Sequence, residues 1–265
     1  MREIKVSELA IYPVKSLRQI MLNNILIDSL GFKFDRRWMV VDENRRMITQ
    51  RKKSRMCLIQ PILERDSLTL QAVGMPDIKI SRSLNSSRQL VTVWEDNCMA
   101  EDCGNEAAEW LSKFLETDCR LFFFPEDEFR QVDTHFAQAG ERIAFSDGFP
   151  ILLISQASLD DLNQRLSVPV AMHRFRPNLV VSGCESFAED NWKMIRIGEL
   201  NFRIVKPCSR CIIPNIDPDS GRKSAEPTRT LSTFRRRENK IFFGQNVIAN
   251  GEGQLETGMS VEIVE

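Results

Sequence analysis

Short apolar and alternating runs, separated by turn-forming residues, fill about the first ninety residues of the chain. Such runs lie at 4–11, 38–41, 56–59, 68–73 and 90–94. Runs of this length between turn residues are typical of β-strands. The polar residues 42–46 predict a hairpin turn, and residues 47–49 predict the returning strand. Many short strands with a turn signal about every ten residues favour a barrel or a sandwich.

The apolar period then changes to that of a helix. One helical face collects the apolar residues of the segment 105–115, namely Ala107, Ala108, Trp110, Leu111, Phe114 and Leu115. A strand-like run at 120–124 follows, and the polar segment after it, 125–142, predicts an irregular loop. We therefore predict two domains, residues 1–120 and residues 121–265.

The second half returns to short strands. After the apolar run 150–154, Ser155 or Ser158 is expected to cap a helix. Its buried face is predicted to consist of Leu159, Leu162 and Leu166. Further strands are expected at 178–181, 194–197, 200–205 and 260–264. The pattern as a whole predicts a mainly β protein with a few helices, of the α+β class, in which two β-barrel-like units meet over a shared cleft.

Charge and cysteine content restrict the class of protein further. The chain has 36 Lys plus Arg against 37 Asp plus Glu, a formal net charge of -1. This balance argues against a general binder of nucleic acid or anionic membranes, since both need a net basic face. Seven scattered cysteines in a chain of 265 residues indicate a reducing compartment. The amino terminus lacks the apolar core of a signal peptide, and no apolar run is long enough to span a membrane. We predict a soluble, cytoplasmic protein.

The strongest candidate for chemistry is the segment Lys206-Pro-Cys-Ser-Arg-Cys211, which the turn-forming run Asp217-Pro-Asp-Ser-Gly221 soon follows. A cation between two thiols favours the thiolate, which is both the nucleophile and the metal ligand. A redox pair would need a following helix, which Pro214 and Pro218 would break. A structural zinc site would normally show a second such pair. Spacing alone leaves a buried thiol, a redox pair and a metal ligand open.

Several further motifs, in order along the chain, carry a resemblance to a known family. They are Ile11-Tyr-Pro-Val-Lys-Ser16, Asp35-Arg-Arg-Trp38, Ser155-Gln-Ala-Ser-Leu159, Arg174-Phe-Arg-Pro-Asn178, Ala188-Glu-Asp-Asn-Trp192, Cys208-Ser-Arg-Cys211 and Phe243-Gly-Gln-Asn246. With them the chain resembles the MOSC-domain proteins that carry an amino-terminal MOSC-type β-barrel, the group containing bacterial YcbX and the mitochondrial amidoxime-reducing component. The resemblance implies a MOSC β-barrel domain preceded by a second β-barrel-like domain.

The resemblance also implies a molybdenum pterin cofactor (Mo-molybdopterin) and its site. The second cysteine of the pair, Cys211, matches the metal ligand and the centre of catalysis, whereas Cys208 is expected to be a buried thiol. A thiolate suits a heavy, sulfur-ligated metal. Tyr12 is expected to pack beside its motif. The positions that match cofactor-binding residues of the family are Lys15, Ser16, Arg36, Ser146, Asp147, Gly148, Arg176, Asn178, Ser209 and Arg210.

In function, the resemblance implies reduction of small N-hydroxylated compounds. One alternative is a sulfur carrier or cofactor-handling protein with a reactive Cys211, and another is a cofactor storage module. Relatives of the YcbX type carry an iron–sulfur domain with Cys-x4-Cys-x2-Cys spacing. Here Cys98 and Cys103 have the first spacing, but Glu106 stands where the third cysteine would be. A separate electron donor, a ferredoxin-like protein or a flavin reductase, is therefore expected as partner, with no nucleic acid and no membrane. Asp217 and Asp219 are expected to form the turn rather than to relay protons.

Overall fold

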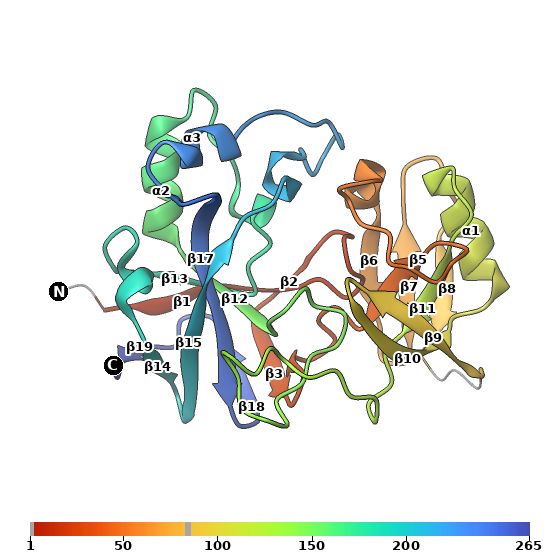
Figure 1. Cartoon of the computed structure of the whole chain (residues 1–265), viewed down its shortest axis with the longest axis horizontal. Coiled ribbons are helices and arrows are strands. Elements are labelled where there is room, and N and C mark those ends of the chain that lie inside the picture. The colour runs from red at the N-terminus through yellow and green to blue at the C-terminus, as the bar shows by residue number, and fades with distance from the viewer. Residues whose placement is uncertain (1–2, 83–85) are drawn as a thin grey trace.

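The computed structural model describes residues 3–82 and 86–265 and has two lobes (Figure 1). The larger lobe, at the left of the view, contains one extended sheet with short helices at one end. The smaller lobe, at the right, consists of two short sheets and a helix. The predicted class, mainly β with a few helices, is confirmed.

The large sheet is almost entirely antiparallel. In spatial order its strands are β19 (Val261–Ile263), β14 (Met194–Ile197), β15 (Leu200–Ser209), β17 (Lys240–Asn250), β12 (Ile151–Ser155), β13 (Leu179–Ser182), β1 (Lys5–Ile11) and β2 (Ile20–Leu22). The short strand β16 (Arg236–Arg237) pairs with β17 outside this order. Strands β12 and β13 run parallel. Apolar residues from one face of this sheet, such as Leu153, Leu179 and Phe202, form a buried core.

The first strand of the chain belongs to the sheet of the second half. Strand β1 pairs antiparallel with β13, with Lys5 opposite Ser182 and Leu9 opposite Leu179. A small sheet likewise joins β3 (Asn24–Asp28) and β4 (Gly31–Phe32) to β18 (Gly253–Glu256). The start of the chain is therefore integrated into the larger lobe. The division into residues 1–120 and 121–265 stays a prediction.

The smaller lobe is built from residues between the two halves of the larger one. Its sheets are β5 (Trp38–Val41), β11 (Arg120–Phe123), β10 (Asp96–Asp102) and β9 (Arg88–Val93), and β6 (Gln60–Leu63), β7 (Ser67–Gln71) and β8 (Ile78–Ser81). The helix α1 spans Asn105–Leu115, as predicted, and all its predicted apolar residues are buried. All of them except Ala108 pack with Trp38, Leu68 and Leu70 in one core, so the apolar stripe of the helix holds the two small sheets together.

Short helices complete the larger lobe. They are α2 (Gln156–Arg165), α3 (Thr228–Ser232) and the 3-10 turns η2 (Met172–Arg174), η3 (Ala188–Asn191) and η4 (Ile213–Asn215). The predicted cap of α2 is confirmed at Ser155, whose side chain accepts a hydrogen bond from the Ser158 N–H. In the described ranges, 3–82 and 86–265, every helix is too short or too polar to cross a lipid bilayer.

Some expectations about elements were wrong. The returning strand expected at 47–49 is reduced to an isolated bridge between Met47 and Val41. The run 56–59, predicted as a strand, lies mostly in the 3-10 helix η1 (Ser54–Leu58), where Met56 and Cys57 are buried. Conversely, β17 is a central strand that the pattern did not predict. Its apolar run is interrupted by Gly244, which has a φ of 82°. A Cβ at this glycine would lie 2.8 Å from the Leu153 carbonyl oxygen, so the close approach of β12 requires glycine there.

Candidate functional site

One cleft is lined by residues from both lobes. The smaller lobe and the segment leading to it contribute Lys15, Ser16, Arg36, Thr49, Arg51 and Trp94. The larger lobe contributes Ser146, Asp147, Gly148, Arg176, Asn178, Cys208, Ser209, Arg210 and Cys211, together with apolar neighbours. All residues singled out for a cofactor from the sequence therefore line a single cleft, although they lie up to about 200 positions apart in the chain.

The two thiols lie at the end of β15 and just beyond it. Cys208 is on the strand, and Cys211 lies in the short connection from β15 to η4. The buried Pro214, in η4, anchors the far end of this connection. Both thiols are partly exposed and line the cleft, and neither forms a disulfide in the part of the chain that the structure describes. The expectation that Cys208 is a buried thiol was wrong. A guanidinium N–H of Arg210 donates to its sulfur at 3.2 Å.

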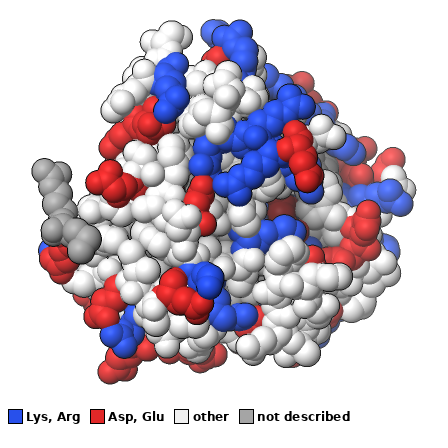
Figure 2. Space-filling model, turned by 60° about the vertical axis from the view of Figure 1, so that its left-hand side comes forward, with Lys and Arg blue, Asp and Glu red and all other residues white. Residues whose placement is uncertain are grey.

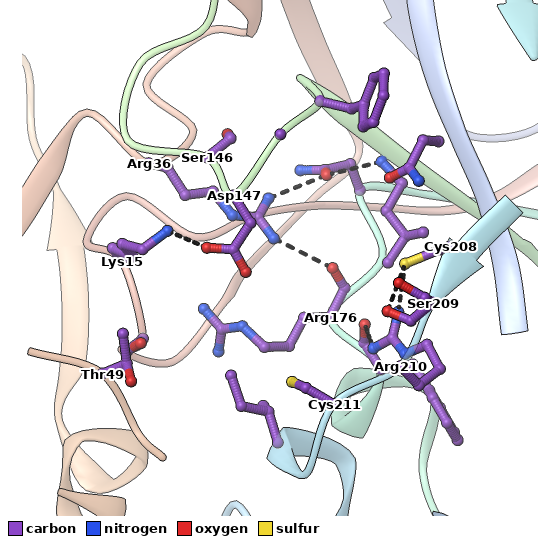
Figure 3. Close-up of a pocket in the computed structure, with 18 of the residues that line it drawn as sticks. Lys15, Arg36, Thr49, Ser146, Asp147, Arg176, Cys208, Ser209, Arg210 and Cys211 are labelled. Atoms are coloured by element: carbon purple, nitrogen blue, oxygen red, sulfur yellow. Dashed lines mark hydrogen bonds and ion pairs between the residues drawn. The ribbon is translucent and has the colours of Figure 1, made fainter. Parts of the chain in front are cut away.

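At the opposite end of the cleft, Lys15 forms an ion pair with Asp147 (Figure 3). The Lys15 side chain is buried, and its Nζ also donates to the Phe145 carbonyl oxygen at 2.7 Å. Burial lowers the pKa of Lys15 despite the neighbouring carboxylate. Desolvation by the walls of the cleft raises the pKa of Asp147, although the side chain is still half-exposed. The Lys15 ammonium, the Trp94 indole N–H and the Arg51 guanidinium together outweigh this effect and hold that pKa below its usual value. Figure 3 shows the Arg176 side chain between this pair and Cys211.

Two arginines of the cleft share one aromatic ring. The guanidinium carbons of Arg36 and Arg176 lie 4.4 and 4.1 Å from the centre of the Tyr12 ring. Arg36 is further held by ion pairing with Asp35 and by a hydrogen bond to Asn178 Oδ1 at 3.0 Å. Tyr12 is buried, as expected for a packing residue, but it also holds two cations of the cleft. Burial raises the pKa of Tyr12 to about 12 and lowers that of Arg176 to about 10, so the phenol stays neutral and the guanidinium charged at neutral pH.

Asn178 is a structural link rather than a free donor. Its Oδ1 accepts from Arg36 and from the Leu152 N–H at 3.2 Å, and its Nδ2 donates to the Ala10 carbonyl oxygen at 3.2 Å. Asn178 therefore links β12 to β1 and also orients the Arg36 guanidinium at the cleft.

Sequence reasoning missed several residues of the cleft, among them Arg51 and Trp94. The Arg51 guanidinium carbon lies 4.4 Å from the centre of the Trp94 indole, and the indole N–H donates to Asp147 at 3.0 Å. The only signal in the sequence was a cluster of basic residues at 51–55, and such clusters are usually solvated surface. No local pattern connects this cluster to a tryptophan more than forty positions away.

The Asp217–Gly221 segment forms the expected turn. Asp217 Oδ1 accepts from the Ser220 N–H at 2.9 Å and the Ser220 hydroxyl at 2.8 Å, which holds the pKa of Asp217 below its usual value. The other oxygen of Asp217 accepts from Arg174 at 2.7 Å. Asp219 pairs with Arg18 at 2.7 Å. These contacts tie the segment after Cys211 to η2 and to the start of the chain.

The donor set of the cleft fits an anionic cofactor with one soft ligand. Among the described lining residues, five are cations (Lys15, Arg36, Arg51, Arg176 and Arg210), whereas Asp147 is the one carboxylate. Two buried Nε atoms, those of Arg51 and Arg210, have no hydrogen-bond partner in the described part of the chain. A phosphorylated pterin would satisfy such donors, and a single thiolate suits a metal that already has sulfur ligands. Within the described ranges no three His, Cys, Asp or Glu side chains cluster as a metal site of their own.

Charge is unevenly distributed over the surface, although the net charge is close to zero. Figure 2 shows a hollow on one face of the molecule with Lys and Arg side chains above and below it, while acidic side chains are frequent elsewhere. Such a surface attracts small anions locally without making the whole protein a binder of polyanions.

Models of two protein domains match the chain, and relatives match most of its length. The MOSC N-terminal beta barrel domain matches residues 3–118, and the MOSC domain matches residues 140–262. Mitochondrial amidoxime-reducing component 1 of Mus musculus is 34% identical over 280 residues, which cover 98% of this chain and 82% of that protein. Mitochondrial amidoxime reducing component 2 of Bos taurus is 36% identical over 243 residues, which cover 87% and 72%. Among solved structures, the YUAD protein of Bacillus subtilis matches with 10% identity and a TM-score of 0.40, covering 99% of this chain and 97% of that one.

Proposed function

Because the chain belongs to the family of MOSC-domain proteins with an amino-terminal MOSC β-barrel domain, we propose that it is a molybdenum-cofactor-dependent reductase of N-hydroxylated compounds. Amidoximes are the substrate class to test first, since relatives covering most of the chain are named for amidoxime reduction. The observation that carries the proposal is the shared cleft, in which the partly exposed thiol of Cys211 faces several cations from both lobes.

We assign the residues of the cleft as follows. Cys211 supplies the protein ligand to molybdenum. The anionic part of the cofactor is bound by the cations Lys15, Arg36, Arg176 and Arg210, groups at Ser16, Ser146, Asp147, Gly148 and Ser209 complete the site, and Asn178 orients Arg36. Lys15 and Arg36 come from the segments that lead to the smaller lobe and Cys211 comes from the larger lobe, so one ligand spans the cleft between them.

When bound, the molybdenum cofactor supplies the two-electron exchange, and the protein sets orientation and charge. In the overall reaction the N–O bond of the amidoxime breaks, two electrons and two protons are consumed, and an amidine and water leave. The cations keep the cofactor anion fixed, and the partly exposed position of Cys211 leaves space for a small substrate. Asp217 uses both carboxylate oxygens in the turn and in its pair with Arg174, which favours a structural role over proton relay.

The electrons come from outside the chain in this proposal. Cys98 is buried and burial raises its pKa to about 12, and burial raises the pKa of Cys103 as well, so neither thiol is poised as a cluster ligand. We propose a separate ferredoxin-like or flavin-containing donor. The cytoplasmic location stays a prediction from the scattered free cysteines, and the word mitochondrial belongs to the names of the relatives.

The direct test is to purify the protein from a host that makes molybdenum cofactor, measure molybdenum and pterin per chain, and then assay benzamidoxime with reduced viologen. We expect stoichiometric cofactor and formation of benzamidine. Cofactor without turnover would instead indicate a storage or handling protein. A cyanide-labile sulfur on Cys211 without molybdenum would indicate a sulfur carrier.

A further inference from the structure

Arg51 differs from the other cations of the cleft, because none of the residues in 3–82 and 86–265 forms a hydrogen bond with its guanidinium. Within the described ranges, Lys15, Arg36, Arg176 and Arg210 each donate to a carboxylate, a carbonyl or a thiol. The Arg51 guanidinium stacks on Trp94 and contributes through its charge to the lowered pKa of Asp147, and its buried Nε has no hydrogen-bond partner among the described residues. A buried N–H of a charged group without an acceptor is costly, so a ligand that supplies one is strongly favoured.

Trp94 holds this guanidinium in place without using its donors. The indole is fixed at its N–H by Asp147 and has a backbone φ of 57°, the left-handed region that bulky residues avoid. The residue is nevertheless 41% exposed. A stack on the indole face stabilises the cation while it leaves the N–H groups at the edge of the guanidinium free.

Arg51 and Trp94 also connect the cleft to a second depression outside it. Thr49, Arg51 and Trp94 line both, and the outer depression adds Arg46 and Lys52, with Met47 and Thr92. No carboxylate is among its described lining residues. An anion at this position would thus meet the three cations Arg46, Arg51 and Lys52, with Asp147 beside them on the indole N–H of Trp94.

We infer that Arg51, supported by Trp94, is a further oxyanion-binding residue at the outer end of the cleft, where it receives a phosphoryl or carboxylate group in a two-point contact. The planar fork of an arginine fits either group with two parallel N–H···O bonds. Two sources share this chemistry. One is the terminal phosphate of the cofactor, which rests on the proposed function, and the other is a carboxylate on the substrate.

The first experiment measures anion binding without the cofactor or catalysis. Pyrophosphate is titrated calorimetrically into the purified chain from a host that lacks molybdenum cofactor, and into Arg51→Met, Arg51→Lys and Trp94→Leu. We expect binding at least tenfold weaker in Arg51→Met, a smaller loss in Trp94→Leu, and a partial loss in Arg51→Lys, which keeps the charge but not the fork.

Arg55→Met is the matched control. Arg55 also stacks on an aromatic ring, that of Phe114 at 4.8 Å, but it is not among the residues that line the cleft. We expect pyrophosphate binding unchanged in this variant. Thermal melting of each variant checks that the fold is intact. If Arg51→Met fails to fold, pyrophosphate binding by Trp94→Leu still tests the inference. Equal affinity of the parent chain, Arg51→Met and Trp94→Leu would overturn the inference.

The second experiment separates the two sources of the oxyanion. A loss of pterin per chain in Arg51→Met, with an unchanged KM, indicates the cofactor phosphate. Unchanged pterin with a KM raised for a carboxylate-bearing amidoxime, but not for benzamidoxime, indicates the substrate. If the parent chain holds no pterin and Arg51→Met still weakens pyrophosphate binding, the inference stands and the proposed function fails.

Discussion

Arg176 stacks on Tyr12, with its guanidinium carbon 4.1 Å from the centre of the ring. Arg36 approaches the same ring to 4.4 Å, so one buried phenol holds two cations of the cleft. Like charges repel, and the negative potential of the ring face offsets this repulsion between the guanidinium groups. The motif around Tyr12 thus connects a core position to the charge of the site.

We predict that Tyr12→Leu and Tyr12→Phe behave differently. Tyr12→Leu removes both stacking contacts and part of the core, which should lower the free energy of unfolding by roughly 2–4 kcal/mol and weaken anion binding. Tyr12→Phe keeps the ring and deletes a hydroxyl that has no described partner, so stability should be unchanged or higher. Urea unfolding of both variants measures this. A loss above about 1 kcal/mol in Tyr12→Phe would show that the hydroxyl has a partner, such as a buried water.

Substitutions of the two thiols of the cleft should differ in their effect on molybdenum retention. We expect Cys211→Ser to abolish molybdenum retention or turnover, because a neutral, harder oxygen replaces a soft anionic ligand. Cys208→Ser should largely spare both, since serine still accepts the hydrogen bond that Arg210 donates to position 208. Metal analysis of the two purified variants is the measurement. Equal loss of metal from both would count against Cys211 as the ligand.

The Lys15–Asp147 pair should make stability depend on acid pH. The folded-state pKa of Asp147 is depressed, so the carboxylate stabilises the fold above its unfolded pKa of about 4, and this stabilisation falls as the pH drops below that value. Asp147→Asn should therefore destabilise the protein more at pH 7 than at pH 3. Urea unfolding at both pH values, with the solvated Asp77→Asn as control, tests the sign. A larger effect at pH 3 would contradict it.

Electron supply should distinguish this chain from a self-sufficient enzyme. We expect turnover of benzamidoxime with reduced viologen and none with NADH or NADPH alone, since the sequence has neither a complete cluster motif nor a Gly-x-Gly-x-x-Gly fingerprint. A separate ferredoxin-like or flavin reductase should restore NADH-driven activity, at a rate that falls with added salt. Robust activity of the single chain with NADH would reveal an unrecognised redox site.

Local patterns predicted the elements that are stabilised locally. The helix 105–115 and its buried face were predicted residue by residue, because a single amphipathic period determines them. Strand β17 was missed because its pairing with β12 and β15 is non-local, and the glycine that this packing requires interrupts its apolar run. The resemblance to the family identified every cleft residue that was assigned from the sequence. It did not identify Arg51 and Trp94, which only tertiary packing brings together.

Because β1 pairs with β13, the strand that is synthesised first completes its pairing only late in synthesis. The first strand leaves the ribosome with its β13 edge unpaired, and its partner, residues 179–182, follows only after roughly ten to thirty seconds at a synthesis rate of about 5–20 residues per second. The strands β5 to β11 pair among themselves, so the smaller lobe can form during that interval. We therefore expect the newborn chain to fold from its middle outwards, with an exposed apolar edge at its start that chaperones protect until the larger lobe closes.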